Sequence, residues 1–338
     1  MAHPRQRLIL WRHRGYGTGT QQDPAAGAGA LTCARGPREK VARVYTKVGR
    51  ALVAVAAAGA LVSGCGSPVQ AGSAIIVGDT SVPLEQVQSQ VGTLLARVPA
   101  EQRQQDTAPT LARDIVTNEL LHTLLARASA EQGVTVTDAE VDAFIEQQGG
   151  AQTLLQNSVL DLEGLRSQAH DFLVATALGR KAAPGLAVTI DLIGSPNRTD
   201  AEAKARTLAA GGPAADALFN DSRTARKGVE VAAATDTQNA GSVVFGTPVG
   251  DVVAYQPDPQ QATWNVFRVT DRRTDARAPG PPAALSLQQL YLIGQRTLQP
   301  IADDLAVRVN PRYGVWDQVS LRVVPADQTA GLVLVSGR

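Results

Sequence analysis

The chain has 338 residues and a formal net charge of +1, and aromatic residues make up only 4% of it. Most of its excess positive charge lies near the start, because residues 65–338 hold 22 Lys and Arg against 29 Asp and Glu, a net charge near −7. This acidic balance argues against a partner bound through a phosphate backbone, which requires a basic patch. The length allows two domains whose cores are built from Ala, Leu and Val.

Residues 1–40 are rich in Arg, Gly and Gln and lack an apolar period. We expect them to be an untranslated or disordered leader, with Val41 standing where an alternative start codon would give a signal peptide of ordinary length. The segment around His13 resembles the catalytic histidine motif of histidine phosphatases. Arg14 replaces the usual glycine and no second catalytic block follows, so no function is predicted for His13.

Residues 41–64 have the features of a lipoprotein signal peptide. Three basic residues precede an uncharged apolar run at 51–62, which is too short for a membrane span of roughly 20 residues. The run ends in Val62-Ser63-Gly64-Cys65, which resembles a bacterial lipobox at all four positions. We predict cleavage between Gly64 and Cys65 and lipidation of the Cys65 thiol, with palmitate among the acyl chains. The alternative, an internal apolar helix with an incidental cysteine, would show a polar period or cap.

Cys65 is the only cysteine left after that cleavage, because Cys33 lies upstream. No disulfide and no cysteine metal site is therefore expected in the exported body. Residues 65–73 are predicted to form a polar linker. We expect a protein anchored to the cell membrane by lipid on its extracytoplasmic side, either periplasmic or on the outer face of the cytoplasmic membrane. The sequence does not assign the membrane leaflet that finally holds the lipid anchor.

Residues 74–183 are predicted to form a helical domain. A short strand and turn open it, and Pro83 stands in the first turn of the next helix. A helix over 110–132 is apolar on both faces and is expected to be central. The capping box Thr137–Glu140 opens a third helix that Gly149 and Gly150 stop, and Asp161 caps a fourth that ends before Pro184.

Residues 184–275 are predicted to be a small α+β domain, because the period changes toward that of strands. We expect helices at 200–210 and 214–219, the first capped by Thr199 or Asp200, and strands at 188–193, 229–232, 242–245, 251–255 and 263–269. Residues 276–338 are predicted to be a Pro-rich linker, one helix over 285–308 that packs back on the helical domain, and a tail.

This order of elements resembles the SurA/PrsA type of exported chaperone. The carrying motifs are Ile76-Val-Gly-Asp79 with Val82-Pro-Leu84, the helix start at 134–145, and Asn310-Pro-Arg-Tyr-Gly-Val-Trp-Asp317, which is similar to the closing motif of the lipoprotein members. The resemblance covers nearly all of residues 74–317. It implies a mainly α fold of the SurA/trigger-factor type with an inserted parvulin-like domain, in which 199–208 resembles the first helix and 264–272 the last strand.

The chain departs from the active parvulins in its chemistry. Those enzymes carry histidines on the first and last strands, where this chain has Ile190 or Asp191 and Asn265, and no histidine follows His170. A site without both imidazoles cannot hold the same polar network. We therefore expect a degenerate domain, no enzyme, no catalytic residue and no cofactor.

Other candidates have simpler structural interpretations. His122 and His170 are expected to be hydrogen-bonded core or boundary residues, since no paired ligand spacing accompanies them. The carboxylate clusters Asp138/Glu140/Asp142 and Asp303/Asp304 are expected to be solvated helix turns, so no metal is predicted.

The function that follows is a membrane-tethered extracytoplasmic chaperone that binds unfolded or newly exported proteins without prolyl isomerase activity. Phe144, Leu165 and Phe172 could serve an apolar groove or the core, so the client-binding residues stay unassigned, as does the oligomeric state. The alternatives are an assembly or scaffold lipoprotein for one specific envelope partner, and a residually active peptidyl-prolyl cis-trans isomerase.

Overall fold

The computed structural model describes residues 72–156, 158–258, 260–276 and 284–336. All of them belong to one of the two compact units into which the chain divides. The predicted leader with His13, the predicted signal peptide at 41–64 and the predicted lipidation residue Cys65 lie outside the described residues. Over the described ranges, helix takes a larger share than strand.

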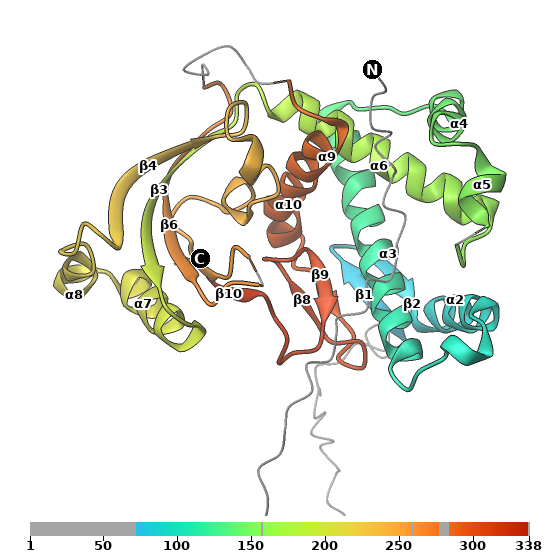
Figure 1. Cartoon of the computed structure of the whole chain (residues 1–338), viewed down its shortest axis with the longest axis horizontal. Coiled ribbons are helices and arrows are strands. Elements are labelled where there is room, and N and C mark those ends of the chain that lie inside the picture. The colour runs from blue at the N-terminus through green and yellow to red at the C-terminus, as the bar shows by residue number, and fades with distance from the viewer. Residues whose placement is uncertain (1–71, 157, 259, 277–283, 337–338) are drawn as a thin grey trace, which may run out of the picture. The chain divides into compact units, whose positions relative to one another are not determined.

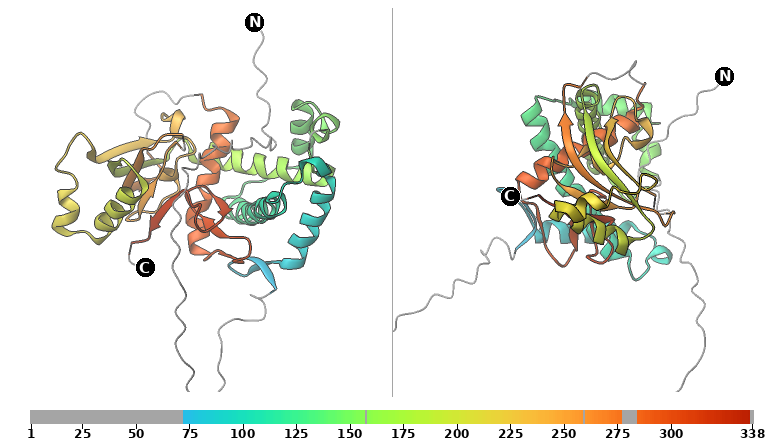
Figure 2. Two further views of the ribbon diagram at one scale, coloured as in Figure 1. Left: turned by 60° about the horizontal axis from the view of Figure 1, so that its bottom comes forward. Right: turned by 90° about the vertical axis from the view of Figure 1, so that its left-hand side faces the viewer.

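Helix α3 (Thr107–Gln132) is the centre of the helical part. Its side chains Val116, Leu120 and Leu124 are fully buried, and it contacts α2 (Leu84–Arg97), α6 (Leu162–Ala182) and α10 (Leu298–Asp304). The left panel of Figure 2 views α3 nearly along its axis, with these helices around it. The prediction of a central helix that is apolar on both faces is confirmed.

Local capping interactions set the ends of the helices. The Thr137 side chain accepts from the Glu140 backbone N–H and Glu140 accepts from the Thr137 N–H, so the predicted capping box opens α4 (Asp138–Gln147). Asp161 accepts from Gly164 N and opens α6. Gly133 ends α3 in the left-handed conformation, with φ of 63°, where a glycine is favoured. The short helices α5 (Ala151–Leu155) and η1 (Ala100–Gln102) complete this part.

Two small antiparallel sheets border the helices. The first has the order β2-β1-β7, formed by β2 (Thr80–Pro83), β1 (Ser73–Val77) and β7 (Arg308–Val309). The second pairs β8 (Val315–Asp317) with β9 (Arg322–Val324). Strand β9 is fastened to α3, because Arg322 lies 2.8 Å from Asp114 and Val323 N donates to Thr117 Oγ1 at 2.9 Å.

A five-stranded antiparallel sheet forms the α+β part. Its strands, in the order β10-β5-β6-β3-β4, are β10 (Gly331–Leu334), β5 (Val252–Tyr255), β6 (Trp264–Arg273), β3 (Ala187–Ser195) and β4 (Ala225–Ala232). Figure 1 shows β4, β3 and β6 curving side by side. Four strands come from the segment predicted to be α+β. The fifth, β10, comes from the C-terminal tail, for which the sequence predicted no strand.

The two faces of this sheet are covered differently. Helix α7 (Arg198–Ala210) with α8 (Gly212–Ala217) covers one face, over a core that includes Ile193, Val252 and Val266. Helix α9 (Leu287–Arg296) and the turn η3 (Val243–Phe245) cover the other, where Phe245, Phe267 and Ile293 are fully buried. Because α9 also contacts α6, one helix packs on both the sheet and the helical part.

Three predictions of local structure are wrong. Residues 242–245 are a 3₁₀ turn rather than a strand, because Ser242 Oγ accepts from Val244 N; another such turn, η2 (Thr237–Asn239), precedes it. Residues 285–308 form two helices and β7 rather than one helix, since Pro300 has no N–H to donate to the Arg296 carbonyl. The cap of α7 is Asn197, not Thr199 or Asp200, because its side chain accepts from Asp200 N at 2.9 Å.

Among the residues that the structure describes, none forms a helix both long enough and apolar enough to cross a membrane.

Candidate functional site

The two histidines of the described chain meet one carboxylate. His122 Nδ1 of α3 lies 2.9 Å from Asp171 Oδ1 of α6, and His170 Nδ1 lies 3.6 Å from the same oxygen. The hydrogen bond to Asp171 raises the pKa of His122; burial opposes that shift, and the charges of Asp171 and Glu119 add to it. Half of the His122 side chain is exposed. The contact between His122 and Asp171 therefore links α3 to α6 at the protein surface.

The predicted carboxylate clusters make ordinary local contacts. Arg166 of α6 contacts Asp142 and lies 3.3 Å from Asp138, while Glu140 belongs to the capping box. Asp303 accepts a hydrogen bond from Gln318. In the described ranges, no group of three His, Cys, Asp or Glu side chains comes together as a metal ion would require.

The positions that would carry the isomerase histidines take part in the packing and pairing of the five-stranded sheet. Ile190 is 3% exposed and lies in the core between the sheet and α9. Asp191 is buried, pairs with Arg268 at 2.8 Å and accepts from Gly228 N. Asn265 stands opposite Gly194 and Tyr255 in the sheet. Residues Phe144, Leu165 and Phe172 are packed as core, with the two phenylalanine rings stacked at 5.2 Å.

The structure brings together a groove of 740 Å³, which we call the edge groove. Strand residues from three different sheets line it: Val309 of β7, Val315 and Trp316 of β8, and Gly331 and Val333 of β10. The lining also includes Arg113 of α3, residues 311–314, Asp317, Gln318, Pro325, Ala326 and Thr329. The carrying motif Asn310–Asp317 thus supplies most of one wall.

All three strands of the edge groove stand at the edge of their sheets. Strand β7 ends the order β2-β1-β7, β10 ends the five-stranded order, and β8 has only β9 as a partner among the described residues. One side of each strand therefore presents backbone N–H and C=O groups that no described strand pairs with. Such edges are templates for the addition of another extended chain.

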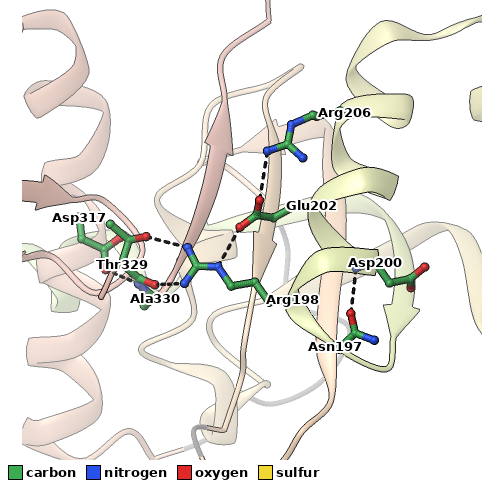
Figure 3. Close-up of polar contacts among 8 residues, drawn as sticks. All are labelled: Asn197, Arg198, Asp200, Glu202, Arg206, Asp317, Thr329 and Ala330. Carbon is green, nitrogen blue, oxygen red and sulfur yellow. Dashed lines mark hydrogen bonds and ion pairs between the residues drawn. The ribbon is translucent and has the colours of Figure 1, made fainter. Parts of the chain in front are cut away.

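A polar clamp holds β10 in place beside β8. Arg198 at the start of α7 donates to Thr329 O at 3.0 Å and to Thr329 Oγ1 at 2.9 Å, and it also pairs with Glu202. From the other side, the buried carboxylate of Asp317 accepts from Ala330 N at 2.9 Å. Figure 3 shows Thr329 and Ala330 between Arg198 and Asp317. Arg206 lies farther along α7 and contacts Glu202. The clamp fixes the segment that leads directly into β10.

The half-buried Arg296 joins α9 to two segments next to the groove. Arg296 of α9 donates to Gly241 O at 2.7 Å and to Val319 O at 2.9 Å. Burial lowers its pKa to about 10, while the charge of Asp317 opposes that shift. The guanidinium therefore ties α9 to the loop before η3 and to the hairpin that carries β8.

The walls of the edge groove combine apolar surface with cationic groups. Arg312 is exposed and lies over the Tyr313 ring at 5.9 Å, and Arg113 is half-buried and donates to Thr110 Oγ1 at 3.1 Å. Neither guanidinium forms an ion pair with a carboxylate of the described residues. The carboxylate of Asp317 also borders the groove, but Val319 N, Ser320 Oγ and Ala330 N already donate to it.

Two buried donors of the lining have no acceptor within the described part of the chain, the Tyr313 hydroxyl and the Trp316 indole N–H. Burial raises the pKa of Tyr313, and the neighbouring Arg312 opposes that shift. A buried unpaired donor costs about 1–3 kcal/mol. Sequence reasoning left the binding residues unassigned; the one signal for them was the Tyr and Trp of the 310–317 motif.

A second hollow of 510 Å³ lies between α4 and α6, lined by residues such as Val141, Leu162 and His170. Its walls are helical side chains alone, so it offers no strand edge to an extended chain.

No protein-family model and no curated protein matches the chain. Among solved structures, it is similar to foldase protein PrsA from Lactococcus lactis, with 9% identity over 74% of this chain and 97% of that chain and a TM-score of 0.25. It is also similar to foldase protein PrsA from Streptococcus pneumoniae, with 13% identity over 71% of this chain and 97% of that chain and a TM-score of 0.23.

Proposed function

We propose that this chain is a chaperone of the extracytoplasmic side of the cell membrane, which binds extended segments of unfolded or newly exported proteins in the edge groove. It is tethered by lipid on Cys65 and has no prolyl isomerase activity. The observation that carries the proposal is that residues of three edge strands, β7, β8 and β10, line one groove.

Strand edges suit a chaperone because main-chain hydrogen bonds do not depend on sequence. The four residues of β10 offer the longest of the three edges. Beside it, Val315 and Val333 provide apolar surface for the side chains of a client. A short strand edge with a small apolar wall binds many different sequences weakly. An unfolded client can therefore dissociate from the groove in order to fold.

The groove starts close to the predicted anchor. Asn310 donates from Nδ2 to Ser73 O at 3.0 Å and from its backbone N to Ala74 O at 2.9 Å, and the next residue, Pro311, lines the groove. Fully extended, the segment from Cys65 to Ser73 spans at most about 28 Å. Lipidation of Cys65 would thus hold the groove near the membrane, where exported chains emerge unfolded.

The absence of isomerase activity is proposed from the residues at the positions concerned. Ile190 is enclosed in an apolar core, and Asp191 is neutralised by Arg268. Neither can take the role of an imidazole that faces a substrate. A proline-isomerisation assay with the purified chain should show no rate enhancement, and a rate comparable to that of an active parvulin would contradict this part of the proposal.

Photo-crosslinking tests the binding site. A photo-reactive amino acid is placed at Val315, which is 37% exposed in the edge groove, and in a matched variant at Val249, which is 54% exposed and is not among the lining residues. A chemically unfolded client should crosslink through position 315 and much less through position 249. The unlabelled chain, at several-fold excess, should suppress aggregation of the same client as measured by light scattering.

Two outcomes would replace the proposal. No suppression of aggregation and no crosslink at position 315 would contradict a chaperone acting through this groove. If a pull-down from envelope extract with the crosslinkable chain recovered one stoichiometric folded partner instead of many substoichiometric clients, the chain would be a scaffold lipoprotein.

A further inference from the structure

We propose that the edge groove selects extended segments in which a carboxylate stands among apolar residues, so that acidic-apolar segments are its preferred clients. This preference rests on the proposed function, because it assigns a substrate class to the same groove.

The lining of the edge groove carries an unbalanced charge. Arg113 and Arg312 both line the groove, and no described carboxylate pairs with either guanidinium. The one acidic side chain of the lining, Asp317, is 4% exposed and accepts three hydrogen bonds from Val319, Ser320 and Ala330. It is occupied by its own chain. The charge left for a ligand is therefore positive, although residues 65–338 as a whole are acidic.

Both guanidinium groups contact a neighbouring side chain of the protein. Arg312 is exposed beside the apolar Val315, and its guanidinium lies over the Tyr313 ring, which limits its freedom. Arg113 lies on α3, half-buried. A guanidinium that is held in place loses less entropy when it binds a carboxylate, and its planar fork matches the two carboxylate oxygens. The groove thus offers a fixed carboxylate receptor next to an apolar wall.

The strand edge and the apolar wall favour a polypeptide carboxylate over a lipid phosphate as the ligand of the groove. A lipid headgroup would use the arginines alone, whereas an extended chain also pairs with the open edge of β10 and covers Val333. An extended acidic-apolar segment therefore uses the positive charge, the apolar wall and the strand edge of the groove together.

The test uses the full chain in detergent and short, fluorescently labelled apolar peptides with both ends blocked, which differ only in a central Glu, Gln or Lys. Fluorescence anisotropy should give the Glu peptide an affinity about fivefold above that of the Gln peptide, the upper end for an ion pair still in contact with water. The Lys peptide should bind more weakly than both. The preference should shrink at high salt, which screens exposed charges.

Variants identify the arginines responsible. R312Q removes an exposed side chain and should reduce the preference for Glu over Gln, and the R113Q/R312Q double variant should abolish it. R226Q is the matched control, because Arg226 is exposed on β4 at the opposite edge of the sheet from β10 and should leave the preference unchanged.

The outcomes distinguish failure of the carboxylate preference from failure of the proposed chaperone function. Equal affinity for the Glu and Gln peptides, with crosslinking through position 315 retained, would overturn the carboxylate preference and leave binding in the edge groove intact. The absence of any crosslink between position 315 and a client would overturn both the carboxylate preference and client binding in the edge groove. If phosphatidylglycerol mixed into the micelles displaced the Glu peptide from the wild-type chain but not from R312Q, the arginines would form a lipid site and the preference would be refuted.

Discussion

Gly179 of α6 and Gly294 of α9 face each other at the point where the two helices cross. A Cβ on Gly179 would lie 2.9 Å from Gly294 N and overlap the Leu290 carbonyl, and a Cβ on Gly294 would lie 2.9 Å from Gly179 N and overlap the Ala175 carbonyl. The relationship is reciprocal. It lets the backbones of two helices touch, and through α9 it joins the helical part to the five-stranded sheet.

Replacing either glycine of this crossing should destabilise the fold strongly. G179A and G294A each place a methyl group against backbone, which cannot move aside as a side chain can, so we expect a loss of about 3 kcal/mol in the free energy of unfolding. Chemical denaturation followed by circular dichroism measures it. The control is G92A in α2, where a Cβ meets nothing within 4 Å; it should be neutral or stabilising by up to about 1 kcal/mol. Equal effects at positions 92 and 179 would refute the close contact.

The hydrogen bond between His122 and Asp171 makes stability depend on pH. The pKa of His122 is raised from 6.5 in the folded chain, chiefly by that bond, so the fold holds the proton more tightly than the unfolded chain does. The contribution is therefore complete below pH 6.5 and is lost as the pH rises through the raised pKa. Because half of the side chain is exposed, we expect less than about 1 kcal/mol.

The measurement compares the wild type with H122Q by denaturation over that pH range. The groups that face the imidazole are Asp171 and His170 of α6 and Glu119 of α3, so a D171N variant should remove most of the same pH dependence. A stability difference between wild type and H122Q that stays constant across neutral pH would contradict the assignment.

Arg198 should affect client binding without touching a client. R198A removes both hydrogen bonds to Thr329, and the segment that leads into β10 then keeps only the contact of Ala330 N with Asp317. We expect client affinity in the crosslinking assay to fall severalfold while the fold persists. R206A is the control (Figure 3), because Arg206 contacts Glu202 on its own helix and nothing near β10. A similar loss for both variants would show that the clamp does not act through Thr329.

Lipidation of Cys65 gives a direct test of the anchor. In a bacterial host that processes lipoproteins, the chain should incorporate labelled palmitate and fractionate with membranes. C65S should abolish both, whereas C33S, which changes the other cysteine of the chain, should abolish neither. Label that persists in C65S would refute the predicted lipobox.

Several features of the fold could be predicted from sequence because their partners lie a few residues apart. The capping box of Thr137 and Glu140 and the cap of Asp161 each span three residues, so composition and spacing are sufficient. The same reasoning failed at Asn197, where three capping residues compete within four positions. It also failed at 242–245, because a short apolar run has no period that distinguishes a strand from a 3₁₀ turn.

By itself, the sequence determined local features: the caps of α4 and α6 and an α3 that is apolar on both faces. It also predicts the lipobox that ends at Cys65. Only the tertiary structure decided that the tail becomes β10, that residues of three edge strands line one groove, and that Arg113 and Arg312 line the same groove. The reason is the separation of the partners. Arg198 and Thr329 are 131 residues apart in the sequence, and Asp114 and Arg322 are 208 apart. No local sequence pattern indicates which strands such distant contacts bring together.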